Sequence, residues 1–487
     1  MSYRNLEEKL RATSDIVGML RNAQTPPYIY PVVPPEYSNW RDEQRAWQKS
    51  CVFFNQSYHM MESYLEGPDA VKLLSRLGVN SFASFTPNKA KQYVACNENG
   101  TVIGDGVLFH LEENVVSFVG RPPVTNWIDY HAATGGYDVT FQRDERALER
   151  MARGLPPLHR MYRFQVQGPL APDVMAKATG KPVPEIRFFQ MGEFVINGRR
   201  VRALRHGMVG QPGWELMGPW AEGDEVRAAI LEAGRDFDLR AAGGRTYSSN
   251  TVESGWIPSP LPAVYTGDDM RPFREWLPAD AYEAVTSIGG SFVSNRIEDY
   301  YLTPADLGYG SLVKFDHDFI GRRALEGDAG KERRRKVTLV WNADDVERAT
   351  GGMLRDEYGR APKYIDLPCA VYSTYPYDRV TRNGRTVGIS TWSGYSANER
   401  TMLSLAMVDV ADATPGTEVT LVWGEEDGGT RKLTVERHRQ IELRATVAPA
   451  PFARPARENY RVGATASRAR NRAGAKAPAH VRRSTSP

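Results

Sequence analysis

The spacing of apolar residues predicts helices in the first half of the chain. Over 224–237 they recur at intervals of three and four residues, which places them on one face of a helix. A helix is also expected over 6–22. A shorter one is expected between Pro68 and Gly78, because proline favours the first turn of a helix and glycine the position just past its end.

Runs of β-branched and aromatic residues between these helices predict strands. Two pairs of such runs flank turns rich in asparagine and glycine, at 97–100 and at Asn197-Gly198, and both are expected to be β-hairpins. The order strand, Gly-Pro, short helix occurs at Gly67-Pro68 and again at Gly168-Pro169. We expect an internal duplication, which covers too few residues for a repeat architecture.

A charged run at 331–336 looks like a boundary, because the sequence beyond it is mostly strand. The runs with strand composition are 337–341, 386–390, 403–408 and 418–423. Glycine and asparagine turns separate them. They predict a small β-barrel or sandwich that ends near Ala448.

Length and composition exclude several classes of protein. At 487 residues, with 41% hydrophobic and 25% charged, the chain is expected to form two or three globular domains. No apolar run approaches the ~20 residues of a membrane helix, and the first residues lack the apolar core of a secretory signal. Cys51, Cys96 and Cys369 lie far apart, so we expect neither disulfides nor a thiolate metal site, and a cytoplasmic location.

The net charge of +3 comes from the C-terminal tail. Residues 454–487 include nine Lys or Arg and one Glu, so the rest of the chain is acidic and predicts no specific nucleic-acid partner. The tail is rich in alanine, arginine, proline and serine, a composition that cannot bury enough apolar surface to fold, so 453–487 are expected to be disordered. The eight histidines show no HxxxH spacing, which disfavours a zinc site.

Two glycine-rich segments on either side of the 224–237 helix carry most of the candidate chemistry. The first contains Glu215 beside a tryptophan, and the second contains Tyr247 and Trp256. Glycines let a backbone approach a flat ligand, and indoles offer faces for stacking. We expect a site for an aromatic cofactor beside a small substrate. The proline- and tyrosine-rich run at 26–35 is expected to line a pocket.

Two separated motifs resemble the tetrahydrofolate-binding aminomethyltransferases, the T-protein of glycine cleavage and its relatives. They are Gly213-Trp214-Glu215-Leu216 and the pair 307–310 and 313–322. The resemblance spans most of 40–445. It implies an α+β fold of the aminomethyltransferase type: an N-terminal arm (1–40), a folate-binding catalytic region of two mixed subdomains (41–330) and a C-terminal β-domain (336–448).

A narrower resemblance is to the bacterial tetrahydrofolate-dependent aryl O-demethylases, above all the type that acts on vanillate or 3-O-methylgallate. The similar segments are 30–33, 88–93, 204–208, 249–262 and 289–294. Aminomethyltransferases carry paired aspartates where this chain has Gly104-Asp105, so one acidic position is missing. Chemistry that relies on the pair is therefore not expected.

The resemblance implies transfer of a methyl group from an aryl ether oxygen to N5 of tetrahydrofolate. Phenolate is a good leaving group, because phenols have a pKa of about 10 and bulk water one of about 15.7. One well-placed acid can then suffice, and the family's catalytic tyrosine corresponds to Tyr247, in a segment read as a loop. By itself Tyr247 reads as one of 23 tyrosines, an ordinary half-buried side chain.

The remaining candidates also take their roles from the resemblance. Glu215 would accept hydrogen bonds from the pterin ring, and Trp256 would lie against the folate; plain packing explains Trp256 equally well. Arg121 would bind a benzoate carboxylate, because two prolines stiffen its loop and a guanidinium suits forked capture. The substrate ring would also contact three further residues, Gln56, His59 and Tyr30.

Two alternatives remain beside the demethylase. One is another one-carbon transferase of the same superfamily, acting on aminomethyl, N-methylglycine or sulfonium groups. The other is a folate-binding module without catalysis. The sequence does not choose between vanillate, 3-O-methylgallate and syringate, and it leaves the oligomeric state open.

Overall fold

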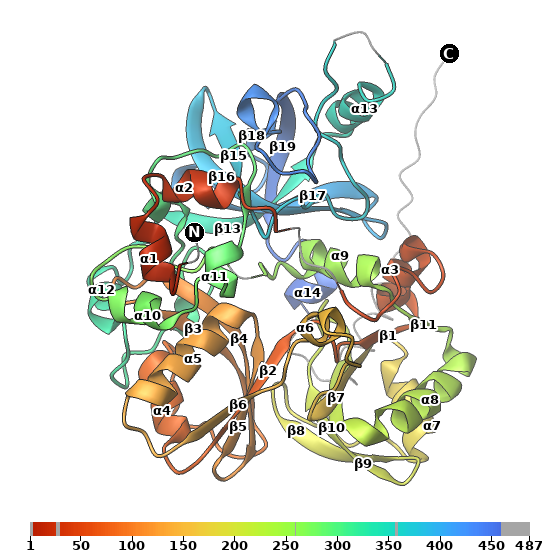
Figure 1. Cartoon of the computed structure of the whole chain (residues 1–487). Helices are drawn as coiled ribbons and strands as arrows, with labels where there is room; N and C mark the ends of the chain where they lie inside the picture. The colour runs from red at the N-terminus through yellow and green to blue at the C-terminus, as the bar shows by residue number, and fades with distance from the viewer. Residues whose placement is uncertain (1–2, 26–29, 259, 356–358, 459–487) are drawn as a thin grey trace, which may run out of the picture.

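The computed structural model describes residues 3–25, 30–258, 260–355 and 359–458. They form two mixed halves, each built on one sheet with helices, and a closed β-barrel that lies above both in Figure 1. The predicted α+β class with a C-terminal barrel is confirmed. Residues 26–29 of the proline- and tyrosine-rich run, and 459–487 of the predicted disordered tail, lie outside the described residues.

The first sheet has six strands in the order β11-β1-β7-β10-β9-β8, antiparallel except where β1 pairs with β11. Apolar side chains such as Phe164, Trp214 and Ile230 fill the space beneath two helices. The elements of this half are β1 Cys51–Asn55, β7 Met161–Gln167, α7 Ala171–Thr179, β8 Met191–Ile196, β9 Arg199–Arg205, β10 Gly213–Pro219, α8 Gly223–Gly234 and β11 Leu239–Ala241.

The second sheet has five antiparallel strands in the order β3-β4-β5-β2-β6. Its elements are β2 Met61–Glu66, α4 Ala70–Leu77, β3 Ala90–Cys96, β4 Val102–Glu112, β5 Val115–Gly120, α5 Pro122–Thr134 and β6 Thr140–Arg143, with α6 Ala147–Ala152 leading back to the first sheet. Both predicted hairpins are confirmed, β3–β4 and β8–β9. In the second, Asn197 and Gly198 have φ of 49° and 75°, as a tight hairpin turn requires.

The duplicated strand, Gly-Pro, helix order is present in both halves, as β2 to α4 and as β7 to α7. Gly67 and Gly168 have φ of 147° and 137°, a region that L side chains rarely adopt. A Cβ atom would lie 2.3 Å from the carbonyl oxygen of Asp138 at the first glycine and 2.4 Å from that of Ser50 at the second. The same steric constraint therefore turns the chain from strand to helix in each half.

The C-terminal region closes into a barrel in the order β13-β17-β16-β15-β18-β19. Its elements are β13 Arg334–Trp341, α13 Ala343–Gly351, β15 Asp378–Arg382, β16 Arg385–Ser396, β17 Thr401–Asp409, β18 Glu418–Trp423 and β19 Ile441–Pro449. The four predicted strands are β13, β16, β17 and β18. The charged run 331–336 is not wholly a linker, because its last residues begin β13.

Short elements connect the three parts. They are α1 Leu6–Arg11, α2 Ile16–Arg21, α10 Arg271–Trp276, α11 Tyr282–Val285, β12 Ile288–Gly289, α12 Arg322–Gly327, β14 Tyr375–Pro376 and α14 Arg454–Glu458. The single helix predicted over 6–22 is two helices, because Asp15 accepts a hydrogen bond from the Gly18 N–H (2.7 Å) and starts a second one. Helix α14 falls in the segment predicted to be disordered, and its Ala456 is buried.

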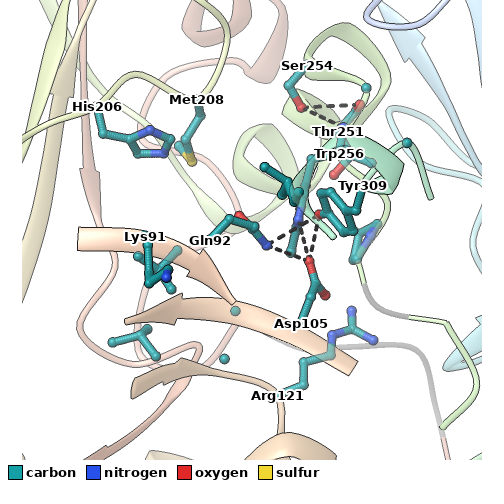
Figure 2. Close-up of a pocket in the computed structure, with 18 of the residues that line it drawn as sticks. Lys91, Gln92, Asp105, Arg121, His206, Met208, Thr251, Ser254, Trp256 and Tyr309 are labelled. Atoms are coloured by element: carbon teal, nitrogen blue, oxygen red, sulfur yellow. Dashed lines mark hydrogen bonds between the residues drawn. The ribbon is translucent and has the colours of Figure 1, made fainter. Parts of the chain in front are cut away.

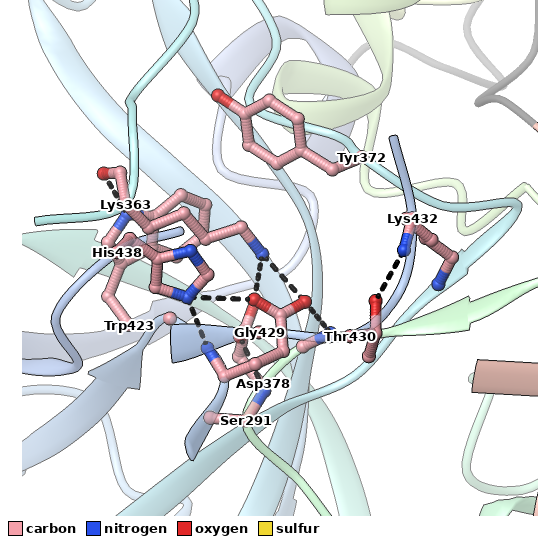
Figure 3. A network of polar contacts seen from close by, with 12 residues as sticks. Ser291, Lys363, Tyr372, Asp378, Trp423, Gly429, Thr430, Lys432 and His438 are labelled. Atoms are coloured by element: carbon pink, nitrogen blue, oxygen red, sulfur yellow. Dashed lines mark hydrogen bonds and ion pairs between the residues drawn. The ribbon is translucent and has the colours of Figure 1, made fainter. Parts of the chain in front are cut away.

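Buried charges hold the loop after β12 between the N-terminal arm and the barrel (Figure 3). Arg21 donates to the carbonyl oxygen of Gly290 (2.8 Å), whose own N–H donates to Glu425 (3.0 Å). Lys363 lies 2.9 Å from the same carboxylate, and Asp378 accepts the N–H of the next loop residue (3.0 Å). Since buried charges are costly unless paired and hydrogen-bonded, these contacts fix the barrel against the two mixed halves.

Helix α9 (Gly244–Ser254) is held by a buried carboxylate at each end. At its start, Glu43 of α3 (Trp40–Lys49) accepts the Gly243 N–H (2.9 Å) and the Thr246 hydroxyl (2.6 Å). Near its end, Glu253 accepts the Trp47 indole N–H (2.8 Å) and the Asn398 amide (3.0 Å). Helix α9 is thereby tied both to α3 and to the barrel.

We expect Glu253→Gln to lower stability, because a glutamine amide would turn a donor toward groups that are themselves donors. Leaving one buried donor unsatisfied costs about 1–3 kcal/mol. Urea and thermal unfolding, followed by circular dichroism, would measure the loss. The matched control is Glu347→Gln on the exposed face of α13, which should leave both midpoints unchanged. Equal midpoints for the two variants would contradict the anchoring role of Glu253.

Candidate functional site

A cavity of about 1350 Å³ lies between the two sheets and the barrel. Six of the seven candidate residues line it: Gln56, His59, Arg121, Glu215, Tyr247 and Trp256. They come from the β1–β2 loop, the β5–α5 turn, β10, α9 and the segment after α9. Residues spread over 200 positions of sequence thus face one space.

Tyr30 is not among the described residues that line the cavity, and it packs behind the site. Its ring stacks on His59, with centroids 5.0 Å apart and planes 7° from parallel. It meets Tyr247 edge-on at 4.9 Å, and its hydroxyl donates to the carbonyl oxygen of Asn55. Tyr30 therefore supports the two rings that reach the cavity.

The hydroxyl of Tyr247 lies 2.5 Å from Nε2 of His59. Nδ1 of His59 lies 2.9 Å from the carbonyl oxygen of Gln56. A carbonyl only accepts, so Nδ1 carries the hydrogen, and Nε2 accepts from the phenol. Burial lowers the pKa of His59 to about 4, and the charges of Arg121 and Arg163 act in the same direction. At neutral pH the imidazole is neutral.

Burial also raises the pKa of Tyr247 above its ordinary value, and the nearby Glu215 carboxylate raises it further. Tyr247 therefore stays a protonated phenol at neutral pH. The sequence placed it in a loop, but it lies in the first turn of α9. Gly244 permits this position, because a Cβ there would lie 2.9 Å from Cβ of Tyr30.

Arg121 stands at the start of α5, directly before two prolines in the first turn. The proline rings fix the backbone dihedral φ there. Proline is tolerated in the first turn because the N–H groups it lacks would have no partner within the helix. The charge of Arg121 is close enough to lower the pKa of both His59 and Tyr247. The guanidinium thus belongs to the same end of the cavity as the phenol.

Glu215 lies in β10 and is 8% exposed, so it is not the surface residue that its place in a strand would allow. Oε1 of Glu215 accepts from Arg163 (2.9 Å), which is itself buried and also bonds Glu62. Burial raises the pKa of Glu215, and the charge of Arg163 offsets part of the effect. The site therefore contains a carboxylate that faces the cavity and is held by one guanidinium.

The sequence did not predict the polar group around Asp105, which Figure 2 shows in the middle of the cavity. Oδ2 of Asp105 accepts from the hydroxyl of Tyr309 (2.7 Å), the amide of Gln92 (2.9 Å) and the indole N–H of Trp256 (3.2 Å). Trp256 is therefore oriented by a hydrogen bond as well as by packing. The Asp105 position was noted only because its acidic neighbour is missing.

Lys336 was also missed, because it belongs to the charged run that was read as a boundary. Its ammonium donates to the carbonyl oxygen of Gly255 (2.9 Å), next to Trp256. Burial lowers its pKa to about 8, and Asp105 opposes this shift. The first strand of the barrel thus contributes a cation to the cavity.

The described ranges contain neither a metal-binding cluster nor a membrane-spanning helix. No group of three or more His, Cys, Asp or Glu side chains there could hold a metal ion. None of the helices in the same residues is long and apolar enough to cross a bilayer. All three cysteines are free thiols.

A family model and two known proteins are similar in sequence to this chain. The family model for the GCVT N-terminal domain matches residues 22–259. Syringate O-demethylase from Sphingobium sp. strain SYK-6 is 51% identical over 457 residues, which cover 94% of this chain and 98% of that protein. Sesamin methylene transferase from Sinomonas sp. strain No.22 is 30% identical over 435 residues, or 86% of this chain and 90% of that protein.

The fold is that of a solved relative. The crystal structure of the glycine cleavage system aminomethyltransferase T from Bartonella henselae matches with a TM-score of 0.56 at 18% identity, covering 90% of this chain and 92% of that one. The sequence identities and the family model show that the chain belongs to the aminomethyltransferase family, in the group that contains syringate O-demethylase.

Proposed function

We propose that the protein is a tetrahydrofolate-dependent O-demethylase. It moves the methyl group of an aryl methyl ether to N5 of tetrahydrofolate and releases a phenol and 5-methyltetrahydrofolate. The observation that supports this most is the protonated Tyr247, hydrogen-bonded to a neutral His59 in the cavity that also contains Glu215. The 51% identity to syringate O-demethylase points to the same reaction.

Syringate is the first substrate to test. The sequence resembles the vanillate and 3-O-methylgallate type, whereas the 51% identical relative acts on syringate. All three are benzoates with a methoxy group beside a hydroxyl. Arg121 would bind the carboxylate, and Gln56 and His59 would hold the ring oxygens near the hydroxyl of Tyr247.

The residues of the cavity fit a reduced folate. Its volume of about 1350 Å³ has room for a pterin and a benzoate together. The carboxylate of Glu215 can accept two N–H groups of a pterin ring, and the indole of Trp256 offers a face to stack on. Tetrahydrofolate supplies the amine that accepts the methyl group.

Tyr247 would act as the general acid. As the bond from methyl carbon to ether oxygen breaks, its electron pair goes to the oxygen, which takes the proton of Tyr247. Tetrahydrofolate would supply the amine that takes the methyl group in exchange for one proton, so protons balance and no oxidant or reductant is needed. That proton would pass through Nε2 of His59, which already accepts the hydrogen bond of Tyr247, and restore the phenol of Tyr247.

Two other readings remain testable. Another one-carbon transferase of the family would act on aminomethyl, N-methylglycine or sulfonium groups, which need no aromatic pocket. A folate-binding module would bind the cofactor without turnover. Three free thiols and a small aromatic acid as substrate fit a cytoplasmic enzyme with no specific nucleic-acid or membrane partner.

Incubation of the purified protein with tetrahydrofolate and syringate is expected to give 3-O-methylgallate and 5-methyltetrahydrofolate in equal amounts. Mass spectrometry of both products would check this, with a reaction lacking tetrahydrofolate as the control. Vanillate and 3-O-methylgallate, run in parallel, would rank the substrates. Binding of tetrahydrofolate without product from any of the three would favour the other readings.

Tyr247→Phe is expected to lower kcat about 10²–10⁴-fold, the usual contribution of a general acid. Binding of tetrahydrofolate should not change, because the phenol is assigned to the ether oxygen and not to the pterin. Rapid-quench kinetics and calorimetry would separate the two effects. Tyr364→Phe, at a half-exposed position outside the lining of the cavity, is the matched control. Full activity in Tyr247→Phe would remove Tyr247 from the mechanism.

Arg121→Met should raise KM for syringate about 10–100-fold, because a hydrogen bond to a charged group is worth about 1.5–3 kcal/mol. The substrate 2,6-dimethoxyphenol lacks the carboxylate, so the variant and the wild type should treat it alike. Arg235→Met on the surface after α8 is the control. An equal loss on both substrates would show that Arg121 does not bind the carboxylate.

A further inference from the structure

Three charged side chains meet in the wall between the two sheets, and only one of them has a role so far. Arg163 of β7 lies between Glu62 of β2 and Glu215 of β10. Arg163 and Glu62 are 3% and 6% exposed. A single guanidinium thus serves two carboxylates, one from each half of the catalytic region.

The two carboxylates are bound differently. Glu62 receives a forked pair of hydrogen bonds from Arg163, one of them from Nε at 3.0 Å, and a further bond from the Ser117 hydroxyl at 2.8 Å. Glu215 receives one bond from the remaining nitrogen of Arg163. The guanidinium also lies over the ring of Phe109, 4.3 Å from its centroid. Arg163 and Glu215 line the cavity, whereas Glu62 lies behind them.

The groups that face Glu215 decide where its carboxylate titrates. Arg163 on β7 lowers its pKa, and Glu62 on β2 raises it, on top of the larger effect of burial. Tyr247 on α9 is also close. Strand β9 lies beside β10, the strand of Glu215, and ends at Arg205, which His206 follows. Burial lowers the pKa of His206 to about 4, and the charge of Arg205 acts in the same direction.

We propose that Glu62 and Arg163 form a positioning pair for the cofactor site: the fork to Glu62 fixes the guanidinium, and its third contact sets the orientation and the charge of the Glu215 carboxylate. The inference rests on the proposed function, because it takes Glu215 as the acceptor of the pterin N–H groups. Neither Glu62 nor Arg163 need touch the reacting atoms. A carboxylate held by one bond keeps its other oxygen for the ligand.

The proposed pair predicts the direction in which the pH dependence of cofactor binding shifts, which a purely structural role of Glu62 and Arg163 does not. The dissociation constant of tetrahydrofolate should rise as the pH falls, because protonated Glu215 loses acceptor capacity. Arg163→Met removes the neighbouring positive charge, so the midpoint of this rise should move to higher pH by about one unit or more. Glu62→Gln removes the competing negative charge and should move the midpoint to lower pH.

Calorimetry with the full-length chain and tetrahydrofolate under anaerobic conditions would measure these midpoints. The pH profile of Glu215→Gln, which has no carboxylate at this position, gives the part of the pH dependence that comes from the cofactor and from other groups. Arg163→Lys keeps the charge but loses the fork, so it should weaken binding at every pH with a smaller shift. Arg200→Met, from an exposed ion pair with Glu193, is the matched control and should shift nothing.

Shifts of opposite sign in Arg163→Met and Glu62→Gln support the pair. Equal weakening at every pH, with no shift in any variant, would overturn it and leave a structural role. If Glu215→Gln binds tetrahydrofolate as the wild type does, the proposed role of Glu215 fails first. Circular dichroism checks folding, and if Arg163→Met does not fold, Glu62→Gln and Arg163→Lys still decide the question.

Discussion

Two buried carboxylates fix the position of helix α9, and the place of Tyr247 in the cavity depends on them. Glu43 and Glu253 are both fully buried, a costly state for a carboxylate unless donors surround it. Besides α9 itself, the donors include Tyr37 and Ser38 of the arm, Trp47 of α3 and Ser396 of β16, so the cost is offset only when those parts are in place. The first turn of α9 then presents Tyr247 to the cavity. The precision needed for a hydrogen bond of 2.5 Å to His59 follows from this anchoring.

The cavity owes its shape to a duplicated fold. Each half turns from strand to helix at a glycine with positive φ that lies against a backbone carbonyl. The two sheets approach one another where β2 and β7 carry Glu62 and Arg163, so an ion pair forms part of the contact between the halves, beside apolar side chains of both sheets. Because the pair lies next to Glu215, the same interaction that joins the halves also shapes the end of the cavity assigned to the cofactor.

Local sequence patterns predicted the parts of the fold that depend on neighbours in the chain. Asn197-Gly198 forms a hairpin turn because few other residues accept positive φ at both positions. Strand β19 was missed because half of its side chains point outward and include Glu442 and Arg444, which dilute the apolar signal. The break within 6–22 was missed because Asp15 reads as one polar residue on a helix until its side chain is seen to cap the next one.

The candidate site shows the same limit. The resemblance gave Tyr247, Glu215 and Trp256, and geometry brought them into one cavity. No local pattern could pair Arg163 with Glu62, since each is a lone charge in a strand and their contact depends on the packing of two sheets. Lys336 was hidden for a similar reason, as a run of charges usually marks a solvated segment and only the register of β13 turns this one inward.

The last described helix, α14, has a consequence for the order of events during synthesis. After β19 the chain returns to the middle of the molecule, where α14 lies close to α9 in Figure 1. The N–H of Ala453 bonds the carbonyl oxygen of Glu253, and Ala456 packs against Gly210. Pro451 and Arg457 join the lining of the cavity, and Tyr30 supports it from the other end of the chain. The segment 450–458 must therefore have left the ribosome before the cavity can close, so a growing chain carries an incomplete cavity until that point of its synthesis.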